Sequence, residues 1–456
     1  MYAIAVTRRS PAPHARSTIL KIASVAALLF AAGPARSQVT TSASVDTTRR
    51  LRLGAVFAAV SERNPKTAAA QSLANAAQAR IPAAGTLPDP ELQLGFMNYE
   101  LPSLRPMDPL GMVQLQVMQM LPVGGKLPLS SRIATHQAAA ERERAADVAW
   151  EQRTRSAMAF YEVFAAEAGI DIASETRRLV QDVASIAHSM YEVGEGNQSD
   201  LLRAQVEIAR MTEEIERMSA MREAAAAKLN ALMDRTADAR VETVALPRFP
   251  DSAPSIDSLL SVALRTRPMI RAGEEEVAAA EAMSLRARRE LIPDLVVGVQ
   301  YGQRSALMGT ERMGSLMLGA SVPLWAGRRQ LRWREEADAM RAMSTADLAW
   351  MKADTRGRIG EMLAMLNRSR RLADLYTGTV LPQAEAAVTS AVAAYRVGRI
   401  DFMNVLDNRM TVNRYRQELV TLRMEEGRAW AELEMLIGRE LFDPWSIAIS
   451  NGLEER

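Results

Sequence analysis

Tyr191-Glu192-Val193-Gly194 returns 204 residues later as Tyr395-Arg396-Val397-Gly398, and this repeat is the key to the fold of the 456-residue chain. A second pair of segments, Asp147-Val148-Ala149-Trp150 and Asp347-Leu348-Ala349-Trp350, lies 200 residues apart. Three prolines recur in the same order, with Pro65, Pro88 and Pro122 matched by Pro268, Pro293 and Pro323. Such repetition indicates two copies of one structural unit. We predict a first structural repeat over 38–245, a second over 246–440, and a C-terminal tail over 441–456.

Each copy is expected to contain a long helical hairpin, at about 127–235 and about 328–438. No proline lies between Leu129 and Val193, so one helix could run for about 60 residues, roughly 90 to 100 Å. The second copy carries Pro382 in the equivalent run, which predicts a kink or break there. An alanine-rich helix precedes each hairpin region, Leu53 to Ala79 with its end marked by Pro82, and Ile256 to Glu290 with its end marked by Pro293.

Heptad patterns follow both Tyr-x-Val-Gly turns and predict knobs-into-holes packing between helices. They are interrupted at Arg222 in the first copy and at the equivalent Glu426 in the second. The seam residues are Leu201, Ala204, Ile208, Met211, Ile215, Met218, Ala225, Leu229 and Leu232, then Val405, Val412, Tyr415, Leu419, Leu422, Ala429, Leu433 and Leu436.

Four strands are predicted, at about 90–101, 111–122, 294–302 and 314–324. Apolar residues alternate in them with glycine, serine or glutamine, as in Val113, Leu115 and Val117. Strands of about ten residues with this alternation are typical of a transmembrane barrel, and a half-buried soluble sheet is the alternative. The helix of about 60 residues weighs against that alternative, because no compact domain buries such a rod.

Residues 1–37 have the layout of a secretory signal peptide, with basic residues, an apolar run from Ile22 to Ala32, and small residues before Gln38. A membrane anchor is the alternative, although the run is shorter than the roughly 20 residues that a spanning helix needs. Removing the five positive charges of this segment changes the net charge from +2 to −3, so we expect no nucleic-acid partner. The chain has no cysteine, so packing or assembly must hold the mature protein.

Four strands cannot close a barrel in lipid, where open edges are prohibitively costly and about eight strands is the practical minimum. The chain must therefore assemble with copies of itself. Two copies would give a filled eight-stranded barrel, whereas three would give about twelve strands and room for a pore. The fold class we predict is mainly α with a membrane β-barrel portion, built from a duplicated β-hairpin plus a long helical hairpin.

With its two Tyr-x-Val-Gly turns, followed by Asp200-Leu201-Leu202 and by Val405-Leu406-Asp407, the chain resembles the TolC-like outer-membrane efflux proteins over nearly all of its mature length. The resemblance implies a homotrimer with a twelve-stranded barrel in outer-membrane lipid, continued by an α-helical tunnel across the periplasm of the bacterial cell. It also implies a periplasmic adaptor (membrane fusion) protein and an inner-membrane pump of resistance-nodulation-division or ABC type. The stretches 87–91 and 97–98 are similar to the heavy-metal branch of the family.

The resemblance also assigns roles to residues near the two turns. Val193, Gly194, Val397 and Gly398 would form the tip turns that dock the adaptor. Tyr395 and Asp200 would form a tip lock, in which Ile400 stands where the family has an arginine and Arg399 lies beside it. Asp407 and Asn404 would line the pore constriction, with Asn404 replacing one of the two aspartates that the family carries.

Other functions find less support in the sequence. Methionine thioethers can bind Cu(I), but the 26 methionines are better explained as packing residues, and we assign no metal site. His136 and His188 lie far apart, and Val123-Gly124-Gly125-Lys126-Leu127 lacks the serine or threonine of a phosphate loop, so neither an enzyme nor a cofactor is expected. The rival classes are a periplasmic adaptor, which would carry one hairpin rather than two, and a structural coiled coil, which would need no strands.

Overall fold

The computed structural model describes residues 50–107, 111–306 and 309–447, which belong to one compact unit. The predicted signal peptide at 1–37 lies outside the described residues, as do residues 448–456 of the predicted tail. The two repeats are therefore parts of a single unit and not two separate domains. Among the described residues, no helix is both long enough and apolar enough to cross a membrane.

Each of the two predicted alanine-rich helices is in fact a pair of helices, α1 (Leu53–Arg63) with α2 (Pro65–Gly85) and α5 (Ile256–Thr266) with α6 (Pro268–Arg289). The prediction of single helices was wrong because proline at the first helical position starts a new helix. Asn64 caps α2 by accepting hydrogen bonds from the backbone N–H groups of Lys66 (3.0 Å) and Thr67 (3.2 Å). Pro82 also does not end its helix, since α2 continues to Gly85.

The first helical hairpin consists of α3 (Lys126–Glu192, 67 residues) and α4 (Gln198–Leu232). The second consists of α7 (Gln330–Leu375), the π-helical turn η1 (Tyr376–Val380), α8 (Leu381–Arg396) and α9 (Phe402–Ile437). The widened turn η1 stands where a kink was expected near Pro382. The ring of Pro382 opposes the carbonyl of Gly378, four residues earlier, and the π turn accommodates this conflict without ending the rod.

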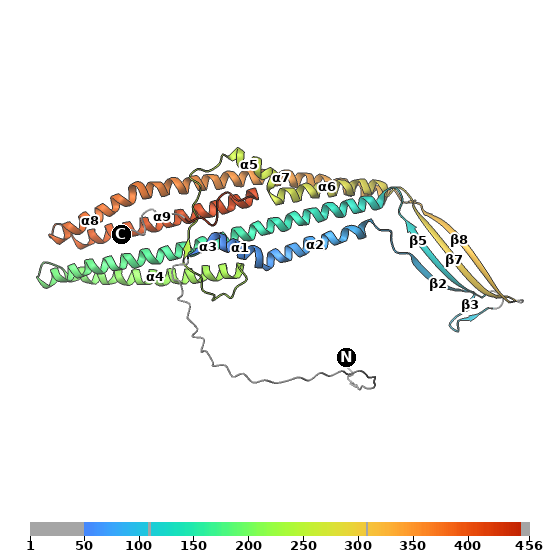
Figure 1. Cartoon of the computed structure of the whole chain (residues 1–456), viewed down its shortest axis with the longest axis horizontal. Helices are drawn as coiled ribbons and strands as arrows, with labels where there is room; N and C mark the ends of the chain where they lie inside the picture. The colour runs from blue at the N-terminus through green and yellow to red at the C-terminus, as the bar shows by residue number, and fades with distance from the viewer. Residues whose placement is uncertain (1–49, 108–110, 307–308, 448–456) are drawn as a thin grey trace, which may run out of the picture. The chain divides into compact units, whose positions relative to one another are not determined.

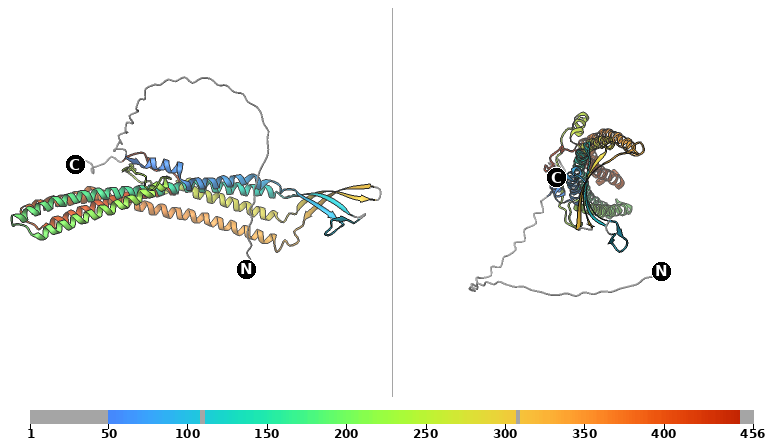
Figure 2. Two further views of the ribbon diagram at one scale, coloured as in Figure 1. Left: turned by 90° about the horizontal axis from the view of Figure 1, so that it is seen from below. Right: turned by 90° about the vertical axis from the view of Figure 1, so that its right-hand side faces the viewer.

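Helix α3 is the axis of the helical part (Figure 1). It packs against α2 and α6 near the strands, and against α4 and α9 toward the hairpin turns. Both helical-hairpin turns lie at the end opposite the strands, as the views in Figures 1 and 2 agree. Near the middle, β1 (Leu51–Arg52) pairs in parallel with β6 (Val244–Ala245), close to α1 and α3.

The main core lies around this middle region and joins α1, α3, α4, α5, α7 and α9. Its largest fully buried side chains include Trp430, Tyr161 and Phe160, each worth about 1.5–3 kcal/mol of hydrophobic stabilisation. The ring of Tyr161 lies where a side chain on Gly427 would stand, so glycine is required at that position of α9. The polar interruptions of the heptads are ion-paired: Arg222 Nε donates to Glu167 (2.8 Å), and buried Glu426 accepts from Arg423 (2.9 Å).

Four long antiparallel strands form one sheet in the order β2 (Glu91–Met97), β5 (Met112–Leu121), β7 (Asp294–Ala306) and β8 (Gly309–Ser321). Strand β7 extends beyond the predicted end at 302, and strand β8 begins before the predicted start at 314. Both are longer because Arg304 and Glu311 still pair across the hairpin. The short β3 (Tyr99–Glu100) and β4 (Arg105–Pro106) pair separately. Pairing of β5 with β7 joins the two copies and leaves β2 and β8 as the edges of the described sheet.

The strand register separates two chemically different faces. One face is mainly apolar, with Gln119 at one end and Gln303 and Arg312 at the other. Its apolar residues are Leu92, Leu94, Phe96, Val113, Leu115, Val117, Leu295, Val297, Val299, Tyr301, Leu316, Leu318 and Ala320. The other face carries a row of polar residues, Gln93, Gln116, Gln300 and Ser315, in which Ser315 donates to Gln300 (3.3 Å). All six methionines of these strands lie on this second face, where Met118 and Met317 flank Gly298, which is the packing role expected for methionine.

Candidate functional site

The two Tyr-x-Val-Gly turns have the same backbone structure. At the end of α3, Gly194 has φ +80° and its N–H donates to Tyr191 (3.1 Å), while Glu195 N–H donates to the carbonyl of Met190 (2.8 Å). At the end of α8, Gly398 has φ +69° and the equivalent bonds are 2.9 Å each. This pair of bonds is the Schellman motif, in which a glycine in the left-handed region ends a helix. The repeat found in the sequence is therefore a repeat of one helix-ending geometry.

An exposed valine stands at each turn. Val193 is 72% exposed and Val397 is 66% exposed, although valine is among the residues most often buried. Neither belongs to an apolar cluster of the described chain. The predicted docking residues are thus presented at the extreme ends of the two helical hairpins, where a partner could cover them (Figure 1).

A small apolar cluster holds the two hairpins together just behind these turns. Tyr395 is 4% exposed and its ring meets that of Phe402 edge to face, with 5.9 Å between centroids. The other buried members come from α3, α4, α8 and α9 and are Ala187, Ala204, Ala391 and Val405. Contact across all four helices means that neither tip can move far without breaking this cluster.

The predicted lock residues lie at this cluster. Burial raises the pKa of the Tyr395 hydroxyl, and the negative charge of Asp200 raises it further. Ile400, which takes the place of the family's arginine, packs against the cluster, while Arg399 beside it is exposed. At this position the chain therefore has an apolar contact in place of an ion pair.

Asn404 and Asp407 lie one turn apart on α9, on its exposed side. The opposite side of the same turns is buried, with Phe402 and Val405 in the tip cluster. No ion pair of Asp407 occurs within the described part of the chain. The structure places the two predicted constriction residues together on one exposed face of α9.

Polar links between the helices behind the tips were not predicted from the sequence. Arg416 on α9 donates to Glu175 on α3 and to Glu385 on α8, both at 2.7 Å. Buried Asn413 donates to Thr176 on α3 at 3.0 Å. Asn413 directly follows the seam residue Val412. Its polar side chain next to an apolar seam was the signal in the sequence that could have indicated a hydrogen bond between helices.

The glycine-rich segment before α3 is a structural turn. Lys126 is buried and its Nζ donates to the carbonyl of Ile292 (2.9 Å) and to Asp294 (2.8 Å), so it fixes the junction between the two copies. His136 is bound to Glu275 (2.7 Å), on the neighbouring helix α6. Within the described residues there is no group of three or more His, Cys, Asp or Glu side chains that could hold a metal ion.

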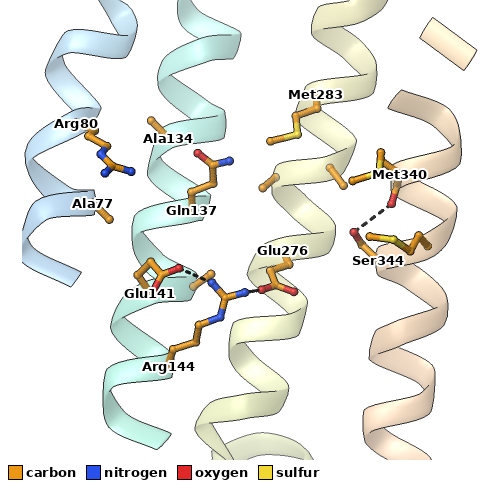
Figure 3. A pocket seen from close by; sticks show the side chains of 14 residues that line it. Ala77, Arg80, Ala134, Gln137, Glu141, Arg144, Glu276, Met283, Met340 and Ser344 are labelled. Atoms are coloured by element: carbon orange, nitrogen blue, oxygen red, sulfur yellow. Dashed lines mark hydrogen bonds and ion pairs between the residues drawn. The ribbon is translucent and has the colours of Figure 1, made fainter. Parts of the chain in front are cut away.

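An open depression of about 430 Å³ lies between α2, α3, α6 and α7 (Figure 3). Arg144 crosses it and pairs with both Glu141 and Glu276, so its charge is internally compensated. Met283, Met340 and Ser344 line the far side. The hydroxyl of Ser344 donates to the carbonyl of Met340 (3.1 Å), and both glutamates pair with Arg144, so the polar groups of this gap between helices satisfy one another.

Comparison with known proteins agrees with this geometry. The model of the family described as "Outer membrane efflux protein" matches residues 58–235 and 259–439, one segment in each copy. The cobalt-zinc-cadmium resistance protein CzcC of Cupriavidus metallidurans is 25% identical over 328 residues, covering 70% of this chain and 75% of the relative.

Three solved structures illustrate the shared fold. CusC superposes with a TM-score of 0.73 at 16% identity, covering 85% of this chain and 92% of CusC. VceC of Vibrio cholerae gives 0.73 at 18% identity, covering 85% and 96%. The open state of the MtrE channel of Neisseria gonorrhoeae gives 0.71 at 15% identity, covering 86% and 90%. The chain therefore belongs to the outer membrane efflux protein family, the non-enzymatic TolC-like channels of tripartite efflux systems, which lie in the bacterial outer membrane, extend into the periplasm and are trimeric partners of efflux pumps.

Proposed function

We propose that three copies of this chain close a twelve-stranded barrel by pairing edge strand β8 of each copy with edge strand β2 of the next. The observation that carries this proposal is the pair of open edges on the sheet, whose two edge strands β2 and β8 are almost wholly exposed in the single chain. Unpaired backbone groups cannot remain open in lipid. Closure by neighbouring copies satisfies both edges at once and needs no other protein.

The two sheet faces support the same assembly. The apolar face would contact lipid, and the row of glutamines and serine would line the lumen. Beyond the end of β8 the apolar alternation continues through Val322 to Leu324, and Trp325 follows with 73% of its surface exposed. Tryptophan is enriched at membrane–water boundaries, so Trp325 marks the periplasmic edge of the proposed membrane region.

Engineered disulfides test the closure, because the chain has no cysteine of its own. Ser315→Cys on β8 is combined in turn with Glu91→Cys, Gln93→Cys or Gly95→Cys on β2, and oxidised membranes are analysed on denaturing gels. At least one pair should give a ladder that ends at three linked chains. The control pair Gln116→Cys and Gln300→Cys lies directly opposite on β5 and β7 and should link only within one chain. A soluble monomer with no ladder would refute the proposal.

For partners, we propose a periplasmic adaptor docked at the tip turns and an inner-membrane pump behind it. Exposed Val193 and Val397 support this, since apolar side chains at the centre of a polar rim are typical of protein interfaces. Substituting both valines by aspartate should abolish efflux while trimers remain on unboiled gels. Normal efflux by this variant would place the docking surface elsewhere.

For the tip and the pore, we propose that Tyr395 and Asp200 form the lock and that Asp407 and Asn404 form the constriction.

For cargo, we propose heavy-metal cations, because the chain is similar to a protein whose name states cobalt, zinc and cadmium resistance. Deleting the gene should lower the growth-inhibiting concentration of at least one of these metals, and a plasmid copy should restore it. A deletion strain sensitive to drugs but not to metals would instead assign drug export.

A further inference from the structure

The two tip turns share one backbone but carry opposite charges at equivalent positions. Glu192 in the first turn corresponds to Arg396 in the second, and Glu195 corresponds to Arg399, each at the repeat offset of 204. All four side chains are exposed. The Schellman bonds are the same in both turns, so the sign reversal is presented on matching geometry.

The reversal extends to the surroundings of each turn. Residues 191–200 contain three acids, with Asp200 as the third, and no lysine or arginine. The equivalent residues 395–404 contain two arginines and one acid, Asp401. The formal charge of the first tip is therefore −3 and that of the second is +1.

Three of these four charges form no ion pair among the described residues: Glu195, Arg396 and Arg399. The fourth, Glu192, lies 3.4 Å from His188 and pairs with no other residue there. The cluster around Tyr395 holds the two tips together, yet the acidic and basic groups do not pair with one another. Each tip thus offers an apolar centre, Val193 or Val397, flanked on both sides by exposed charge of one sign.

We propose that the tips form a charge-coded docking surface for the helical-hairpin ends of the adaptor, in which the first tip binds a basic group and the second binds an acidic group. This rests on the proposed function, which supplies the partner. Complementary charges around an apolar centre set specificity and register more than affinity, because like charges brought together are penalised. A trimer has six tips, three of each kind, that alternate around the ring. Rotating the partner by one tip would therefore put like charges together. The code therefore selects one of two possible registers.

The test uses the full trimer in detergent and two synthetic helical hairpins that differ only at two residues beside the connecting turn, lysines in one and glutamates in the other. Each hairpin carries a bromoacetyl group at its turn. The channel carries a single cysteine at one tip, Ser199→Cys or the equivalent Met403→Cys. The basic hairpin should label position 199 roughly fivefold faster than position 403 at low salt, and the acidic hairpin should show the reverse preference. Both preferences should fade in 0.5 M salt, where screening shortens to a few ångströms.

Charge exchange provides the decisive comparison. Glu192→Arg and Glu195→Arg combined with Arg396→Glu and Arg399→Glu should invert both preferences. Arg356→Glu with Arg371→Glu, two exposed arginines on α7 without ion pairs among the described residues, should leave them unchanged. Equal labelling by both hairpins, or a preference that ignores the exchange, overturns the charge code. A weaker trimer band for Glu192→Arg with Glu195→Arg, without any labelling preference in the parent, would assign the charges to contacts between neighbouring tips and also overturn it. Absence of trimers in the parent would refute the proposed assembly instead.

Discussion

At the scale of single residues, Tyr395 is buried at the tip, and burial together with the negative charge of Asp200 raises the pKa of its hydroxyl. The sequence led to this pair only through family resemblance, since residues 195 positions apart give no local signal of contact. It could not show that Ile400 would join the apolar cluster, because an isoleucine at a turn can be exposed or buried.

The first prediction concerns this lock. Asp200→Ala combined with Tyr395→Phe keeps the ring packing and removes the polar interaction, worth about 1 kcal/mol. An opening equilibrium should shift by about fivefold, seen as higher mean conductance in planar bilayers. Tyr395→Phe alone keeps the phenyl ring but already removes the hydroxyl, so it should give the same shift as the double variant. Unchanged conductance of the double variant would remove both residues from the lock.

The second prediction concerns Glu434, which is almost fully buried in the main core. Burial raises the pKa of its carboxyl, although Leu441 N–H donates to it (2.7 Å) and Arg153 lies nearby. A raised pKa means that the stability linked to this group is complete below the ordinary carboxylate pKa and is lost as pH rises through the raised value. Glu434→Gln avoids that loss and should be more stable than the parent near pH 7.

The measurement is thermal melting of the detergent-solubilised protein between pH 4 and pH 8. The gap between Glu434→Gln and the parent should close toward pH 4, where the parent carboxyl is protonated. Glu440→Gln is the matched control, because Glu440 binds the same Arg153 (2.8 Å) from an exposed position. A gap that stays constant with pH would show that burial of the charge is not the cause.

At the scale of elements, the positions of prolines predicted where helices end or kink, and the alternation of apolar residues predicted the strands. Pro65 and Pro268 each start a helix, because proline favours the first helical position. The sequence therefore contained the signal for these two helix starts as well as for the repeat. The response to Pro382 was harder to foresee, because a rod can break, kink or widen by one residue, and packing against α9 decides among these. Strand length was underestimated at β7 and β8, where Arg304 and Glu311 look like loop residues until they pair across the hairpin.

The third prediction belongs to the end of β8. If Trp325 lies at the membrane boundary, brominated phospholipids in proteoliposomes should quench it. Trp325→Ala should therefore lower the quenched fraction of the fluorescence from the six tryptophans. Trp350→Ala removes a similarly exposed tryptophan from α7, 25 residues further on, and should raise that fraction. A quenched fraction unaffected by Trp325→Ala would move the membrane edge away from this residue.

At the scale of the whole molecule, alternation predicts the two faces of a strand but not its neighbour. Pairing of β5 with β7 joins copies that are more than 170 residues apart, and only the folded chain reveals it. That pairing fixes which strands remain as edges, and hence how copies can meet. It also means that the first and second helical hairpins of one chain stand side by side, so a closed ring of three would alternate the two kinds of tip.

The last prediction follows from that ring. If Asp407 lines the constriction as proposed, three copies would bring three Asp407 carboxylates to one level of the tunnel, where rings of acidic side chains select cations. Asn404 lies one helical turn away on the same exposed side and carries no charge. In planar bilayers, Asp407→Asn should lower the cation-to-anion permeability ratio several-fold, and Asn404→Asp should raise it. Asp374→Asn, the same change at an exposed site on α7, should leave the ratio unchanged. The ratio is obtained from the reversal potential in a salt gradient, and equal values for Asp407→Asn and the parent would place the constriction at other residues.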